Sequence, residues 1–463
     1  MKKINRYKKG IVAVIAAFLI SLIVPVAQSC DDFTEVDLPA SQLAADAVFQ
    51  DNTTATAALL DIYAKIRNTG LLTGYPNGLS HQMGLYADEL VMYGGDPSFY
   101  NNNVLPTASD ITQLWNSSYN QIYAANALLE GVTTSTYLTA QQKEILQGEA
   151  LFVRALIHFY LYNTFGDIPY ITTTDYQTNS TVHRMDRETV FQYLSDDIDS
   201  AVSLLPENYT LQDRSRPNRA VALALKARVS LYNEQWQQAE DAASAVIGNN
   251  LYQLTPVEQA FLNNATATLW QLSPELSGGN TLEAGTFTFF SGPPPLSALS
   301  QELYDTFEEQ DLRKQFWIGS VTDGTQTWYY PAKYDQVSNS GTSLEYSVMF
   351  RLPEIYLIRA EAQAHLGNLA EALQDLNTVR NNAGISNIQT PSQEILLTAI
   401  AEERKRELFT ELGHRFFDLK RTGKLNEVLS PLKPGWESTD AQLPLPEAEL
   451  LLNTNLLPQN IGY

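Results

Sequence analysis

The stretch Phe350–Gly384, FRLPEIYLIRAEAQAHLGNLAEALQDLNTVRNNAG, sets the pattern on which the rest of the chain is built. Apolar residues recur at helical spacing on both sides of Leu366-Gly367-Asn368, which has the composition of a turn. The apolar faces consist of Ile355, Ile358, Ala362 and Leu366 on the first helix, and of Leu369, Ala372, Leu376 and Val379 on the second. Gly384 can adopt a positive φ and end the second helix. The stretch therefore predicts two antiparallel helices joined by a tight turn.

The stretch Arg219–Ile247, RAVALALKARVSLYNEQWQQAEDAASAVI, repeats this pattern 133 residues earlier. The matching pairs are Ala227 with Ala360, Trp236 with Leu369, Ala239 with Ala372, and Val246 with Val379. One such unit alone is compatible with an ordinary helical hairpin, but a repeated unit of roughly 34 residues with Gly at the turn is the tetratricopeptide pattern. The sequence thus predicts a mainly α protein with tetratricopeptide-like hairpins at about 219–248 and 350–384.

The charge of the chain argues against several classes of partner. The formal net charge is −22, and the first 29 residues hold five Lys or Arg and no acid, so the remainder is still more acidic. Nucleic acids and anionic lipid head groups need basic patches, and neither is expected as a partner. Hydrophobic and charged shares of 44% and 18% are typical of a globular protein.

The N-terminus has the features of an export signal. A basic start is followed by the apolar run Ile11–Val24, and the only cysteine, Cys30, comes directly after a small residue. This arrangement is similar to a bacterial lipobox, which predicts a signal peptide over 1–29, lipidation of Cys30 and a tether over 30–40. A conventional signal peptidase site with an incidental Cys30 is the alternative. Residues 41–463 are expected to form a single domain.

Between the two hairpins the composition changes. Residues 251–347 are rich in Gly, Pro and Thr and include Gly278-Gly279-Asn280 and Pro293-Pro294-Pro295. An irregular segment of this length inside a folded domain is usually functional, so we expect an insertion that carries the ligand site.

Motifs for catalysis or metal binding are not found in the sequence. No two of the five histidines stand four residues apart, and neither GxSxG nor GxxxxGK[ST] occurs. We expect no enzyme activity, no metal site and no cofactor. The charged run Glu402–Glu407 is interpreted as a structural helix whose partners are supplied by nearby residues, among them Arg404, Arg415, Asp418 and Arg421.

Five pieces of the chain, in order and spacing, resemble the SusD/RagB family of outer-membrane nutrient-binding lipoproteins. They are GEALFVRALIHFYLYNTFGDIPY at Gly148–Tyr170, the hairpin at Arg219–Ile247, RLPEIYLIRAEA at Arg351–Ala362, ERKRELFTELGHRFFDLKRTG at Glu403–Gly423, and LPLPEAEL with PQNIGY near the C-terminus. The resemblance spans essentially the whole chain after the predicted signal.

The resemblance implies a function as well as a fold. It implies a surface lipoprotein of the outer membrane that captures a polysaccharide or oligosaccharide and passes it to a TonB-dependent (SusC-like) transporter. Two alternatives remain open: a peptide-binding member of the same family, and a structural lid of the transporter without ligand selectivity.

Sugar sites combine aromatic faces with polar side chains, placed on loops. Two loop stretches have this composition: the loop after the helix predicted over His81–Met92, where the resemblance also places ligand contacts, and the insertion. The candidate residues are Tyr93, Asp96, Phe99, Tyr100, Asn101 and Asn102 in the first stretch, and Phe289, Phe290, Trp328 and Tyr330 in the second. Replacing Phe99 or Tyr100 by Ala is expected to weaken binding without unfolding the protein.

Overall fold

The computed structural model describes residues 45–390 and 392–463. The chain divides into two units, residues 1–48 and 49–463, and the described part of the first is the one-turn helix α2 (Ala45–Val48). The predicted signal peptide, Cys30 and the tether lie outside the described residues. Among the helices that the structure describes, none is long and apolar enough to cross a membrane.

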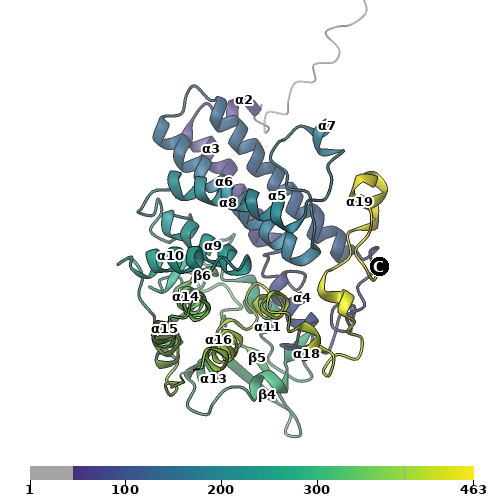
Figure 1. Cartoon of the computed structure of the whole chain (residues 1–463), viewed down its shortest axis with the longest axis vertical. Coiled ribbons are helices and arrows are strands. Elements are labelled where there is room, and N and C mark those ends of the chain that lie inside the picture. Colours follow the sequence, from purple (N-terminus) through teal and green to yellow (C-terminus); the bar gives the residue numbers. More distant parts are fainter. Residues whose placement is uncertain (1–44, 391) are drawn as a thin grey trace, which may run out of the picture. The chain divides into compact units, whose positions relative to one another are not determined.

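Antiparallel helices that pack in succession dominate the second unit (Figure 1). The first of them begins at Asn52, where the Asp51 side chain caps the helix by accepting from the backbone N–H of Thr53. The series consists of α3 (Asn52–Asn68), α5 (Ser109–Thr134), α6 (Ala140–Phe165), α8 (Arg187–Leu204), α9 (Arg219–Tyr232), α10 (Trp236–Ile247), α14 (Leu352–Leu366), α15 (Leu369–Asn382), α16 (Gln393–Leu408) and α17 (His414–Arg421). The prediction of a mainly α hairpin array is confirmed.

The two predicted hairpins form as α9–α10 and α14–α15. Gly367 ends α14 with a φ of +87°, a conformation that a residue without Cβ adopts at little cost. Ala360 and Ala372 are fully buried where α14 meets α15. Leu366, which the pattern placed in this contact, is exposed instead. Leu366 is the last residue of α14, next to the turn at Gly367, and the buried part of α14 packs against α10 of the first hairpin as well as against α15.

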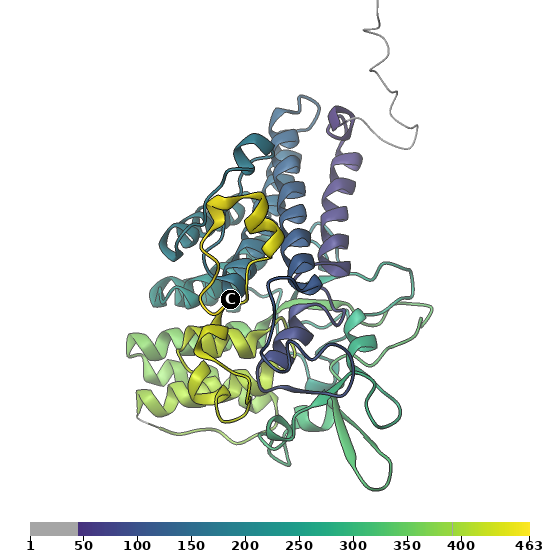
Figure 2. The same cartoon turned by 90° about the vertical axis from the view of Figure 1, so that its right-hand side faces the viewer.

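Short strands replace regular helices in the loop-rich part of the chain. Three two-stranded antiparallel sheets pair β1 (Leu90–Met92) with β3 (Ser297–Leu299), β2 (Thr268–Leu272) with β6 (Ser347–Arg351), and β4 (Ile318–Thr322) with β5 (Thr327–Pro331). Short helices lie between them: α11 (Leu282–Phe287), α12 (Gln301–Tyr304) and α13 (Leu312–Phe316). Figure 2 shows this part, in teal and green, beside the helices of the second hairpin.

The helix predicted over His81–Met92 is only partly correct. Helix α4 (Leu79–Tyr86) ends before Ala87, and the last three residues of the predicted helix form strand β1. Strand β1 forms because Leu90, Val91 and Met92 find a partner in β3, more than 200 residues later. A pairing over this distance leaves no signal in the local sequence.

Buried ion pairs fix the insertion to the helical array. Arg313 of α13 is fully buried and lies 2.7 Å from carboxylate oxygens of both Glu403 and Glu407 on α16. Arg351, at the start of α14, also pairs with Glu407, and with Glu411 at 2.8 Å. Glu403 and Glu407 of the charged run are therefore structural, and besides Arg406 the partners of Glu403 and Glu407 come from distant segments.

Candidate functional site

The structure brings the two predicted ligand stretches side by side. Strand β1 pairs with β3, and directly after it the backbone N–H groups of Tyr93 and Gly94 both donate to the carbonyl oxygen of Leu296, at 2.8 and 3.0 Å. A Cβ on Gly94 would lie 2.3 Å from the Pro295 oxygen, so only glycine permits this approach. The loop after β1 therefore rests on the segment that follows Phe290.

Several candidate side chains lie at the surface of these loops. Tyr93 is 43% exposed and Phe290 is 77% exposed, and large apolar surfaces left open in this way are available to a ligand. Asp96 and Asn101 are exposed as well. Tyr100 is half-buried, and the ammonium of Lys433 covers its ring at 4.0 Å from the centroid.

Two candidates of the first stretch are buried and correct the sequence-based expectation. Phe99 is 3% exposed and packs edge-on against Tyr86. Asn102, 5% exposed, donates from Nδ2 to the Tyr86 carbonyl oxygen at 2.9 Å. Both side chains are used to hold the loop on α4, so neither offers surface to a ligand. The Phe99→Ala substitution should consequently destabilise the fold, contrary to the expectation from the sequence.

Two candidates of the second stretch are buried as well. Phe289 and Trp328, 4% and 5% exposed, form a small apolar cluster with Ala298 of β3. Tyr330 is half-buried and packs against Phe289 with ring centroids 5.0 Å apart. This cluster holds the strands beneath the Phe290 loop together, which accounts for the apolar residues that occur there.

A cavity of about 360 Å³ opens beside these loops. Its lining consists of Tyr75, Pro76, Thr281, Leu282, Gly285, Thr286, Phe287, Thr288, Phe289, Pro295, Leu296, Ser297 and Val337. Tyr75 and Val337 are 47% and 42% exposed and contribute open surface to it. Tyr75 was not among the residues singled out in the sequence, although an aromatic residue in a Gly/Pro/Asn loop is the same signal that identified Tyr93.

Hydrogen bonds to neighbouring segments fix the polar groups of the cavity. Thr286 Oγ1 donates to the Gly74 carbonyl oxygen at 2.7 Å. Ser297 Oγ lies 3.0 Å from Nε2 of the buried His81, whose Nδ1 lies 2.8 Å from the Pro76 carbonyl oxygen. Burial lowers the pKa of His81 to about 4, so the imidazole is neutral at physiological pH. The cavity is thus preformed, and the described residues on its lining carry no charged side chain.

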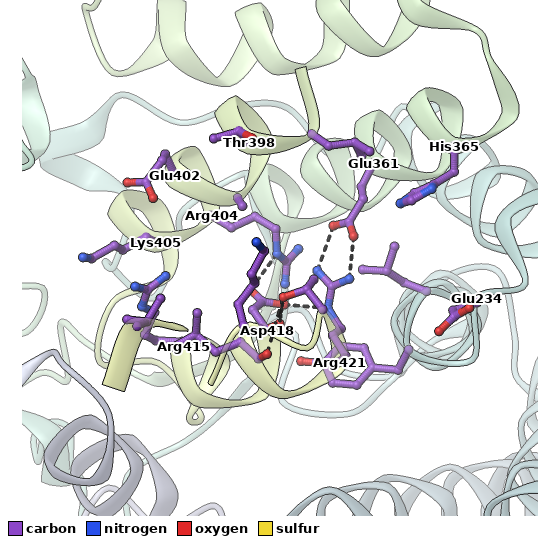
Figure 3. A pocket seen from close by; sticks show the side chains of 18 of the residues that line it. Glu234, Glu361, His365, Thr398, Glu402, Arg404, Lys405, Arg415, Asp418 and Arg421 are labelled. Atoms are coloured by element: carbon purple, nitrogen blue, oxygen red, sulfur yellow. Dashed lines mark hydrogen bonds and ion pairs between the residues drawn. The ribbon is translucent and has the colours of Figure 1, made fainter. Parts of the chain in front are cut away.

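A larger cavity, of about 520 Å³, is lined by the turn between α9 and α10, by α14 and by α16 and α17 (Figure 3). Four of its charged groups form one network: Asp418 accepts from Nε of Arg404 at 2.7 Å and from Nε of Arg421 at 2.8 Å, and Arg421 also binds Glu361. The rings of Trp236 and His365 stack at 3.9 Å. Nη1 and Nη2 of the buried Arg404 have no hydrogen-bond partner among the described residues, and none of the ligand candidates from the sequence lines this cavity.

Two models of known protein families match parts of this chain. Residues 87–231 match a model described as "Starch-binding associating with outer membrane", and residues 317–463 match the "SusD family" model. Together the two matches cover more than half of the chain.

Individual relatives agree with these matches over nearly the full length. SusD-like protein P25 from Formosa agariphila is 23% identical over 94% of this chain and 97% of the relative. A SusD superfamily protein from Parabacteroides distasonis has a TM-score of 0.77 at 20% identity and covers 91% of this chain and 100% of its own. A laminarin-binding SusD-like protein has a TM-score of 0.74 at 26% identity, covering 89% and 99%. The fold, the order of the helices and both family models agree: the chain belongs to the SusD/RagB family.

Proposed function

We propose that this protein binds a polysaccharide or oligosaccharide at the cavity beside the Tyr93 and Phe290 loops. The observation that carries the proposal is the combination of exposed aromatic rings with a preformed cavity lined by hydroxyl groups. Aromatic faces suit the C–H faces of sugar rings, and hydroxyl groups suit their hydroxyls. Membership of a carbohydrate-binding family and the laminarin-binding relative support the same function.

Membership of the SusD/RagB family also suggests a role for the protein in the cell. We propose that the protein is anchored in the outer membrane through an acylated Cys30 and passes its ligand to a TonB-dependent, SusC-like transporter, without catalysis. Extraction from the native membrane in mild detergent should retain such a transporter with the protein. Cys30→Ala should release the protein from the membrane fraction, whereas an unchanged distribution would contradict lipid anchoring.

Neighbouring phenylalanines in the insertion offer a matched test of the site. Phe290 is 77% exposed and Phe289 is 4% exposed. Phe290→Ala should weaken glycan binding by about 5- to 20-fold, or ~1–2 kcal/mol, with unchanged thermal stability. Phe289→Ala should lower stability by ~3–5 kcal/mol because it empties a buried position. Isothermal titration against neutral glucans, mannans and xylans measures the first effect, and a thermal melt measures the second.

The outcomes separate the alternatives. Unchanged affinity in Phe290→Ala, and also in Tyr93→Ala, would remove the proposed site. Peptides found by mass spectrometry on the gently purified protein, together with no glycan binding, would favour a peptide-binding member of the family over the proposed function.

A further inference from the structure

The cavity beside the Phe290 loop presents hydrogen-bond acceptors at two defined places. Thr286 Oγ1 uses its only proton in the bond to the Gly74 carbonyl oxygen at 2.7 Å, so its lone pairs alone remain for a ligand. The threonine hydroxyl is held there because Gly74 and α11 are in close contact, where a Cβ on Gly74 would lie 2.3 Å from Glu283. The first acceptor position is therefore fixed by the backbone.

The second acceptor position depends on His81. The Pro76 carbonyl oxygen can only accept, so Nδ1 of His81 must carry the proton that is shared between them. The ring is 3% exposed and neutral, hence Nε2 is unprotonated and accepts the proton of Ser297 Oγ. Ser297, like Thr286, is left with lone pairs only. The two hydroxyls thus favour a ligand that brings hydroxyl donors.

The charges around the cavity also favour an uncharged ligand over an anionic one. The described residues that line this cavity include no Lys, Arg, Asp or Glu. Glu283 is buried against Gly74, and Asp96 is exposed on the loop after β1; neither lines the cavity. The chain as a whole carries a net charge of −22. An anionic ligand would lose water without gaining a cationic partner, which is costly for any charged group.

From this geometry we infer that the site selects uncharged glycans and rejects carboxylated or sulfated ones. The inference rests on the proposed function and specifies its ligand class. A neutral sugar hydroxyl donates to Thr286 or Ser297. A carboxylate or sulfate group has only acceptor oxygens, which would face lone pairs at Thr286 and Ser297. The hydroxyls of Tyr75 and Thr281, which also line the cavity, can donate to such a group but supply no countercharge.

Matched pairs of polysaccharides test the selectivity. The probes are laminarin with sulfated laminarin, and β-1,4-mannan with polymannuronate, measured by affinity electrophoresis and titration at 50 and 500 mM NaCl. The neutral member of the pair that binds should bind at least 10-fold more tightly than its anionic counterpart at 50 mM NaCl. Its affinity should change less than twofold with salt, because no ion pair contributes to it.

A charge-insertion variant provides a second measurement. Val337→Arg places a guanidinium at the cavity, and should raise the affinity for the anionic probe by about fivefold at 50 mM NaCl but not at 500 mM. Leu451→Arg, at a 77% exposed position of helix α19 (Glu447–Leu452), is the matched control and should leave the ratio of the two affinities unchanged.

The results distinguish the inference from the function on which it rests. Equal or tighter binding of the anionic probe by the unmodified protein overturns the inference and leaves glycan binding in place. An equal gain in Leu451→Arg and Val337→Arg also overturns it, since the effect would then come from net charge. Failure of all four probes and of the wider set of glucans, mannans and xylans to bind removes the proposed function and the inference together.

Discussion

Two adjacent acidic residues, Asp88 and Glu89, have opposite protonation behaviour. Asp88 lies between Arg415 and Lys405, which hold its pKa at about 2 in spite of burial. Glu89 has no such contact: its carboxylate accepts one backbone N–H, from Thr410 at 3.2 Å. Burial and the negative charge of Asp88 raise the pKa of Glu89 to about 8. At neutral pH the folded protein therefore holds a proton on Glu89.

This proton makes stability depend on pH. The pKa of Glu89 is raised on folding from an ordinary value near 4.5, so the folded state binds more protons between pH 4.5 and 8, and stability falls as pH rises through that range. Glu89→Gln keeps the shape without the titration. The stability of the unmodified protein relative to this variant should fall by ~1 kcal/mol per pH unit between pH 5.5 and 7.5, measured by urea unfolding. A constant difference would contradict the protonated state.

The individual residues of the candidate site were only partly predictable from the sequence. Composition pointed to two loops that the structure places side by side, because aromatic residues among Asn, Asp and Gly are unusual in segments without periodicity. It could not separate Phe290 from Phe289, or Tyr93 from Phe99, since exposure depends on contacts with β3 and α4 that are remote in sequence. Tyr75 joined the site through the same long-range packing.

Among the helices and strands, α16 is the element that connects the insertion to the helical array, through the ion pairs of Glu403 and Glu407. Arg313→Met should destabilise the protein by ~3–5 kcal/mol, because it leaves Glu403 and Glu407 buried with fewer cationic partners. The matched control is Lys424→Met, whose pair with Glu427 is exposed and should contribute less than ~1 kcal/mol. Thermal unfolding of the two variants compares them. Equal midpoints would show that the buried cluster does not hold the insertion in place.

Elements with a strong internal pattern were predictable, and those defined by distant partners were not. The second hairpin has its turn at the predicted residues because Gly367 and the helical periodicity are local signals. Strand β1 and the partners of Glu403, Glu407 and Glu411 come from segments that are far away in the chain. Local composition contains no information about such pairings.

For the molecule as a whole, the position of the insertion has a consequence for the order of folding. Helices α10 and α14 pack together although about a hundred residues separate Ile247 from Leu352. Closing a loop of that length costs ~4 kcal/mol of chain entropy before the contact is made, whereas α3 to α10 meet through shorter connections. The N-terminal helices should therefore acquire protection from amide hydrogen exchange before α14–α16 in a pulse-labelling experiment. During synthesis the chain emerges from its N-terminus, so this half can fold while the candidate ligand loops and the second hairpin are still being made.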